Sequence, residues 1–419
     1  MAISEPSLSL RQQVRSLPRN VWVLTGTSFL TDVSTEMIVH LLPLFLANVL
    51  GVRTVTVGLI EGLAETTSSL VKLLSGRWSD RLQQRKGLTV AGYALSTVAK
   101  PFLALARSWP AVLLVRFVER VGKGVRTAPR DALVADSVDA RQRGLAFGLH
   151  RAGDTAGAAL GLAIALVVVW RLQGSAVALA ANTFTVLVWA SFVPALAAVI
   201  LLLIALREPQ RAQPMGTGLA SLPRLPYLPG VAFRRYLLIV TLFTLGNASD
   251  AFLVLRAQSV GLGITAILAL LLLYNLVYTA VSSPAGVVSD RLGPQRLLLA
   301  GWLLYAAIYA GFALAAAAWH LVALFALYGI YYGLTAGAAR AFVADLVPAH
   351  QRGTAYGWYN AAIGVAALPA SVIAGLLWQG IGSWSGFSAP VAFLWGAALS
   401  LLAALLFYSW FPPGRRAAV

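Results

Sequence analysis

The chain lacks cysteine altogether, which excludes disulfide bonds, thiolate catalysis and cysteine-ligated metals. Its four histidines are spread along the sequence, so no spacing indicates a metal site, and neither a metal nor a cofactor is expected. Charged residues make up only 11% of the chain, against about 25% in a typical soluble protein. Hydrophobic residues reach 59%. No soluble core can absorb that excess, so lipid must be the solvent for much of the surface.

Long apolar runs take the place of the missing charge, and each has about the 20 residues that a membrane-spanning helix needs. We therefore predict an all-α membrane protein with twelve transmembrane helices. The runs of the first half are 21–48, 55–77, 88–106, 110–134, 144–170 and 182–206. Those of the second half are 235–256, 264–287, 296–317, 319–344, 353–378 and 391–411. Residues 1–19 are polar and basic with no small-residue cleavage site after them, which indicates an uncleaved first helix.

The net charge of +17 follows the predicted topology. Of the 32 Lys and Arg, 19 fall in segments on one side of these spans, four on the other side and nine within the spans. Basic residues accumulate on the cytoplasmic side of membrane proteins. Both termini are therefore predicted to be cytoplasmic, and no nucleic-acid partner is expected.

The sequence divides into two related halves. A polar, proline-rich stretch predicts a cytoplasmic linker at 207–233 between a six-helix half at 1–206 and another at 234–419. The segments 76–82 and 286–292 share five identities in seven positions at an offset of 210 residues. An even number of helices in each half makes the repeats parallel, an arrangement that places a transport site between the halves.

The repeated segment carries a family resemblance. Gly76 to Lys86 reads Gly-Arg-Trp-Ser-Asp-Arg-Leu-Gln-Gln-Arg-Lys and resembles the helix 2–3 loop signature of the major facilitator superfamily, with a weaker copy at 286–296. The stretch Arg-Thr-Ala-Pro-Arg-Asp at 126–131 resembles a largely uncharacterised prokaryotic branch of that superfamily. The resemblance covers the whole chain and implies a multi-pass transporter of the prokaryotic inner membrane, with no substrate inherited from the family.

The loop signature supplies candidate gating residues. An acid at the end of one helix can lie at the positive N-terminal end of a neighbour, and the resemblance implies that this neighbour begins near Gly353. Contacts of this kind can hold a gate in one conformation and break in another. Arg81 can pair with Asp136 at the end of the fourth helix, and Arg291 and Asp345 repeat this possibility in the second half. The candidates are Asp80, Arg81 and Asp136 in the first half and Asp290, Arg291 and Asp345 in the second. The alternative is a plain basic loop that only sets topology.

Acids inside the predicted spans are candidates for proton coupling. Asp32 and Glu36 lie one turn apart on one face of the first helix, and Glu61 and Glu65 repeat that spacing on the second. Asp154 on the fifth helix is the fifth candidate. Charges at membrane depth are costly and face the interior of a bundle or a water-filled cavity. Each of them can equally be half of a permanent ion pair, and Arg116 and Arg120 are the expected partners of Asp32 and Glu36.

Polar and aromatic positions on three further helices are candidates for the substrate cavity. Those of the fourth helix are Arg116, Arg120 and Lys123, those of the seventh are Asn247 and Asp250, and those of the tenth are Tyr328, Tyr331 and Tyr332. The eight bases and seven acids within the spans of the first half nearly balance, so their sum does not reveal the charge of the substrate. The tyrosines can line a cavity or pack between helices. Charges in the first half and aromatic rings in the second favour a substrate with an apolar part.

These features predict a monomeric secondary transporter that moves a small molecule by alternating access. Proton-coupled efflux of an amphiphilic compound is the leading hypothesis. Uptake of an organic anion along the basic stripe of the fourth helix is one alternative, and a non-transporting receptor or scaffold with the same fold is another. An enzyme is not expected, because His150 and Asp154 have the spacing of an acyltransferase motif without the glycine that follows it, and no ATPase motif is present.

Overall fold

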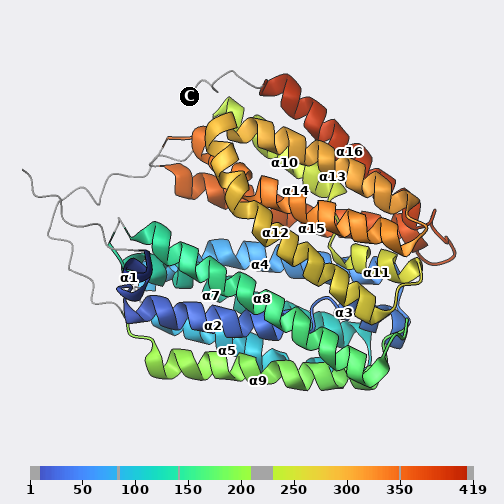
Figure 1. The fold of residues 1–419 in the computed structure, drawn as a ribbon, viewed down its shortest axis with the longest axis horizontal. Helices are drawn as coiled ribbons and strands as arrows, with labels where there is room; N and C mark the ends of the chain where they lie inside the picture. The colour runs from blue at the N-terminus through green and yellow to red at the C-terminus, as the bar shows by residue number, and fades with distance from the viewer. Residues whose placement is uncertain (1–9, 83–84, 140–141, 209–229, 349–350, 413–419) are drawn as a thin grey trace, which may run out of the picture.

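A computed structural model describes residues 10–82, 85–139, 142–208, 230–348 and 351–412 of the chain (Figure 1). Every regular element within these ranges is helical. The N-terminal half contains α1 (Leu10–Arg15), α2 (Arg19–Glu36), α3 (Leu42–Leu44), the π-helix η1 (Phe45–Val49), α4 (Thr54–Leu82), α5 (Arg85–Ala99), α6 (Phe102–Leu105), α7 (Trp109–Asp136), α8 (Arg143–Gln173) and α9 (Ala181–Ala205). The C-terminal half contains α10 (Val231–Gly246), α11 (Ala251–Ser259), α12 (Ile264–Leu292), α13 (Pro294–Leu314), α14 (Ala318–Asp345), α15 (Arg352–Gln379) and α16 (Ala389–Trp410).

These helices form twelve membrane-crossing segments, six in each half, which confirms the predicted fold class. Three crossings are composite: α2 continues through α3 into η1, α5 into α6, and α10 into α11. Among the described residues, nine helical segments are long and apolar enough to cross a membrane by composition alone. The other three crossings contain α2, α4 and α7, the helices that carry Asp32, Glu61 and Arg116. The charged residues make the sequences of these three segments less apolar. The segments can still cross the membrane because the charged side chains are directed into the bundle.

The two halves lie side by side in Figure 1, with the N-terminal half (blue to green) below the C-terminal half (yellow to red). Within the N-terminal half α2 packs on α8 and α9, and α4 packs on α7. Glycines permit the closest of these contacts: a Cβ atom added at Gly157 or Gly161 of α8 would lie 2.4 Å from a backbone oxygen of α2. The halves meet where α4 packs on α15 and α8 packs on α12.

We call the end of the bundle where α4 and α9 end and α5 and α10 begin the linker end, and the opposite end the loop end. Hydrogen bonds between the halves close the loop end. Thr54 donates through its hydroxyl to the carbonyl oxygen of Gly375 at 3.0 Å and through its backbone N–H to the side chain of Gln379 at 2.9 Å. Asn48 donates to the side chain of Gln258 at 3.2 Å. The loop end is therefore shut in this structure.

Close backbone approach extends the seal toward the middle of the bundle. A Cβ atom added at Gly58 of α4 would lie 2.2 Å from the carbonyl oxygen of Ser371 on α15. Toward the linker end, in contrast, Lys123 and Arg340 are exposed although both lie on membrane-crossing helices. Exposed charges at that depth face water rather than lipid. Water therefore reaches the interior from the linker end.

Candidate functional site: a polar cavity between the halves

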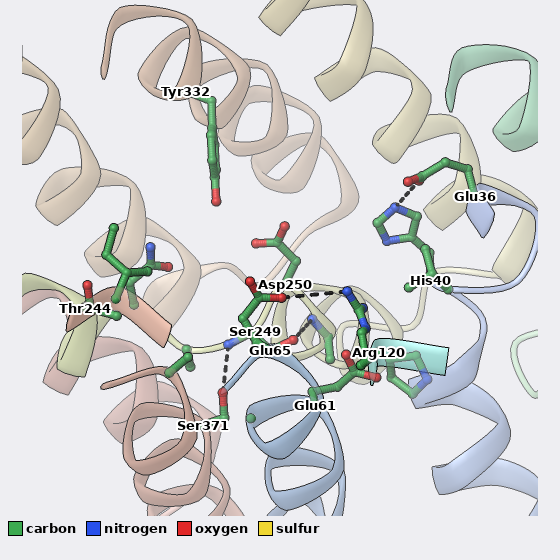
Figure 2. A pocket seen from close by; sticks show the side chains of 18 residues that line it. Glu36, His40, Glu61, Glu65, Arg120, Thr244, Ser249, Asp250, Tyr332 and Ser371 are labelled. Carbon is green, nitrogen blue, oxygen red and sulfur yellow. Dashed lines mark hydrogen bonds and ion pairs between the residues drawn. The ribbon is translucent and has the colours of Figure 1, made fainter. Parts of the chain in front are cut away.

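A cavity of about 360 Å³ lies between the two halves, within the size range of small-molecule sites (Figure 2). Its wall is built from α2, the turn after it, α3, α4, α7, the junction of α10 and α11, α14 and α15. Polar lining residues include Glu36, His40, Glu61, Glu65, Arg120, Thr244, Asn247, Ser249, Asp250, Tyr332 and Ser371. Val39, Pro43 and Ile363 add apolar surface. Such a wall suits a compound that is partly polar and partly apolar.

Two interrupted helices border this cavity. α2 ends at Glu36 and the helix resumes at Leu42, while α10 ends at Gly246 and α11 begins at Ala251. Irregular backbone at membrane depth is tolerated where it lines a cavity, because its polar groups need partners that lipid cannot supply. The apolar runs 21–48 and 235–256 locate both crossings but do not reveal that their helices are interrupted. Pro43, which has no N–H to donate, and the polar run 247–250 were the available signals.

The bases of α7 pair with the acids of α4. Arg116 is buried and donates to both carboxylate oxygens of Glu61, at 3.1 and 3.2 Å, and to Glu119 at 2.7 Å. Arg120 lies 3.7 Å from Glu65, whose side chain is 52% exposed. Since α4 packs on α7 while α2 packs on α8 and α9, the two arginines meet the acids of α4. The expectation that they pair with the acids of α2 is therefore wrong.

The acids of α2 have different surroundings from one another. Glu36 accepts a hydrogen bond from His40 at 2.9 Å, shown as a dashed line in Figure 2. No hydrogen bond or ion pair in the described part of the chain reaches Asp32, which is partly exposed. Asp32 lies outside the wall of the cavity, and the charged groups near it are Asp154, Glu36, Lys123 and Arg130.

Asp154 lies on α8, with a carboxylate oxygen 3.5 Å from the ring nitrogen Nδ1 of His150. Like Asp32, it lies outside the wall of the cavity. The five acids named from the sequence therefore fall into two groups. Glu36, Glu61 and Glu65 line the cavity, and Asp32 and Asp154 lie near one another beside it.

The C-terminal half contributes aromatic rings and one acid. Tyr328 and Tyr331 are buried and pack among other rings, whereas Tyr332 lines the cavity and points into it in Figure 2. The hydroxyl of Tyr328 donates to a carboxylate oxygen of Asp250 at 2.7 Å. Asn247 accepts a hydrogen bond from Tyr305 at 3.0 Å. Of the three tyrosines named from the sequence, one therefore belongs to the cavity wall and two support it.

Four polar lining residues were not among the site candidates chosen from the sequence. His40, Thr244, Ser249 and Ser371 all belong to the cavity wall, and Ser371 accepts a hydrogen bond from the backbone N–H of Ser249 at 3.2 Å. The internal repeat was the signal in the sequence that could have identified His40 as a lining residue. An offset of 210 residues relates His40 to Asp250, so the two interruptions occupy equivalent places in the two halves.

The gating candidates lie at the linker end. Asp136 at the end of α7 forms an ion pair with Arg85, the first residue of α5. Arg291 and Asp345 are exposed, and no ion pair joins them among the side chains that the structure describes. The side chains of Asp80, Arg81 and Asp290 lie outside the described part of the structure.

Two six-helix halves that enclose a polar cavity at membrane depth define a secondary transporter. The family model of the Major Facilitator Superfamily matches residues 24–367 and 237–419. The chain therefore belongs to the major facilitator superfamily, which confirms the family resemblance of the loop signature. The family also confirms that the protein is a transporter and not an enzyme.

Similar proteins agree with this assignment. An uncharacterised MFS-type transporter of Methanocaldococcus jannaschii is 36% identical over 398 residues, covering 94% of this chain and 95% of its own. The solved structure of a D-xylose-proton symporter has a TM-score of 0.76 at 16% identity, covering 98% of this chain and 100% of that chain. A bacterial homolog of the human lysosomal transporter Spinster, in an inward-facing and unoccupied conformation, has a TM-score of 0.75 at 14% identity, covering 97% of this chain and 98% of that chain. These two structures support the fold alone.

Proposed function

We propose that this transporter exports a small amphiphilic compound in exchange for protons, by alternating access, as a monomer in a prokaryotic plasma membrane with both chain termini in the cytoplasm. The observation that carries the proposal is the composition of the cavity wall. Four acids, Glu36, Glu61, Glu65 and Asp250, line it beside apolar surface and the ring of Tyr332. Carboxylates take up and release protons as their surroundings change, because burial and nearby charges favour different protonation states.

The direction of transport follows from the proton gradient. The gradient across a prokaryotic plasma membrane points inward, so exchange of protons for substrate moves the substrate outward. We place the linker end in the cytoplasm. Because the loop end is closed and the linker end is accessible to water, the structure then corresponds to a cytoplasm-facing state that can bind such a substrate.

Uptake of an organic anion fits the cavity less well. That hypothesis relies on free bases along α7. Arg116 is instead buried between Glu61 and Glu119, Arg120 faces Glu65, and Lys123 lies outside the cavity wall. A receptor or scaffold fits less well too, since a bundle that transports nothing can replace costly buried charges with apolar residues.

Proton movement in proteoliposomes tests the proposal. Liposomes that contain purified protein and a trapped pH-sensitive dye are given an outward-directed gradient of an amphiphilic compound, from a panel of amines, alcohols and carboxylates of one carbon skeleton. We expect at least one compound to drive protons inward as it leaves, at a rate above that of passive permeation in protein-free liposomes. Substrate and protons moving in the same direction would favour uptake. Binding without movement of any panel member would favour the receptor.

A further inference from the structure

The acids of the cavity wall differ in how their charge is balanced. Arg116 forms an ion pair with Glu61, Arg120 forms one with Glu65, and His40 donates a hydrogen bond to Glu36. Asp250 accepts a hydrogen bond from the hydroxyl of Tyr328. No cationic side chain in the described part of the chain lies within ion-pair distance of Asp250. Asp250 is therefore the lining acid whose charge the described residues leave without a cation.

The backbone around Asp250 contributes partial charges of both signs. The carbonyl oxygens of Asn247 and Ala248, at the interruption between α10 and α11, accept no hydrogen bond from described residues. The C-terminal end of α10 carries a partial negative charge, and the N-terminal end of α11, which follows Asp250, carries a partial positive charge. Although Asp250 directly precedes α11, its side chain caps none of the N–H groups of that helix. The carboxylate is directed to Tyr328 and the cavity instead.

An aromatic ring stands beside this acid in the cavity. Tyr332 lines the cavity, and its ring is held by edge-to-face contacts with Tyr274 and Tyr328, at centroid distances of 5.8 and 5.1 Å. A cation within about 6 Å of an aromatic face is attracted by the ring, most strongly where water is excluded. A carboxylate with no cationic partner beside a positioned ring is the arrangement that recognises an ammonium group.

We propose that the transported compound is an organic cation, whose ammonium group binds Asp250 beside the ring of Tyr332 while its carbon skeleton lies against Val39, Pro43 and Ile363. This inference names the substrate class of the cavity and rests on the proposed transport function. A cavity of about 360 Å³ accommodates an organic molecule and is far larger than a bare inorganic ion needs. Asp250 is then the residue that determines specificity for charge.

Three probes of one skeleton test the inference: 4-phenylbutylamine, 4-phenylbutanol and 4-phenylbutyrate. Their binding to the full-length protein in lipid nanodiscs is measured by titration calorimetry, with protein-free nanodiscs as background. We expect the amine to bind about tenfold more tightly than the alcohol, and the carboxylate to bind most weakly. An alcohol or carboxylate that binds as tightly as the amine, or an amine that does not bind, overturns the proposal.

Matched variants assign the effect to the two residues. Asp250→Asn keeps the size of the side chain and an oxygen that can accept the hydrogen bond of Tyr328, and we expect it to lower amine affinity about tenfold while alcohol affinity stays unchanged. Tyr332→Leu should weaken amine binding and Tyr332→Phe should preserve it, because only the ring is required. Asp139→Asn, which removes an exposed charge far from the cavity wall, should leave all three affinities unchanged. Unchanged amine binding in Asp250→Asn overturns the assignment.

The same protein in proteoliposomes separates this inference from the proposed function. Preferential amine binding that depends on Asp250, with no proton movement for the amine, supports the cation site and contradicts proton exchange. Proton-coupled export of the alcohol or the carboxylate, with the amine ignored, supports the transport function and contradicts the cation site.

Discussion

Asp32 and Arg116 lie on neighbouring membrane helices, and neutralising Arg116 should destabilise the fold far more than neutralising Asp32. Arg116→Gln leaves Glu61 and Glu119, both at most 9% exposed, as two like charges without their shared cation. Removing one partner of a buried pair costs about 3–5 kcal/mol, and this site strands two carboxylates. Asp32→Asn removes no ion pair or hydrogen bond among the described residues, so its effect on the free energy of unfolding should stay within about 0.5 kcal/mol.

The assay combines stability with transport for each variant. The free energy of unfolding is measured in lipid nanodiscs by denaturant titration, and proton-driven transport is measured in liposomes with a cargo that the wild-type protein exports. Asp32→Asn should remain stable and bind the cargo but fail to concentrate it against a gradient, because Asp32 is the proton-coupling candidate from the sequence that no ion pair among the described residues holds in its charged form. Arg116→Gln should lose stability, and adding Glu61→Gln should restore part of it by removing one stranded charge.

Two results would refute this reasoning. If Asp32→Asn destabilises the fold as strongly as Arg116→Gln, Asp32 belongs to a structural ion pair. If Asp32→Asn is stable and still concentrates cargo with a normal pH dependence, coupling resides elsewhere, and Glu36→Gln is the next variant to test. Glu36 differs in having His40 as a hydrogen-bond partner.

Three further predictions concern topology and gating. Cysteines introduced at Ser9, Gly216 and Ala418 should resist an impermeant thiol reagent in intact cells and react in inverted vesicles, in a chain with no native cysteine; the reverse pattern contradicts cytoplasmic termini. Asp80→Asn should shift the accessibility of cysteines placed in the cavity, because it removes the charge that we propose interacts with a helix end; wild-type accessibility and transport would reduce Asp80 to a topology signal. Gly58→Val should prevent the loop end from closing, since a Cβ there would lie 2.2 Å from a backbone oxygen of α15; spin-label distances across the loop end should lengthen, and unchanged distances contradict the seal.

The amino-acid sequence alone determined the class of fold. Lipid cannot hydrogen-bond the backbone, so an apolar run of sufficient length must form a helix whatever it packs against. For that reason the twelve crossings could be located within a few residues, and the internal repeat divided them into two halves. Intramembrane charges such as Glu61 and Arg116 were also visible as candidates, because charge at that depth is costly and must face the interior.

Only the tertiary structure decided how those candidates are used. Helical periodicity shows which residues share a face, but the element that this face meets depends on packing between distant segments. α4 packs on α7, so Arg116 meets Glu61 and leaves Asp32 without an ion pair in the described chain. The interruption at residues 247–250 likewise places Asp250 on the cavity wall. The substrate site is defined by these non-local contacts, which no single segment of sequence contains.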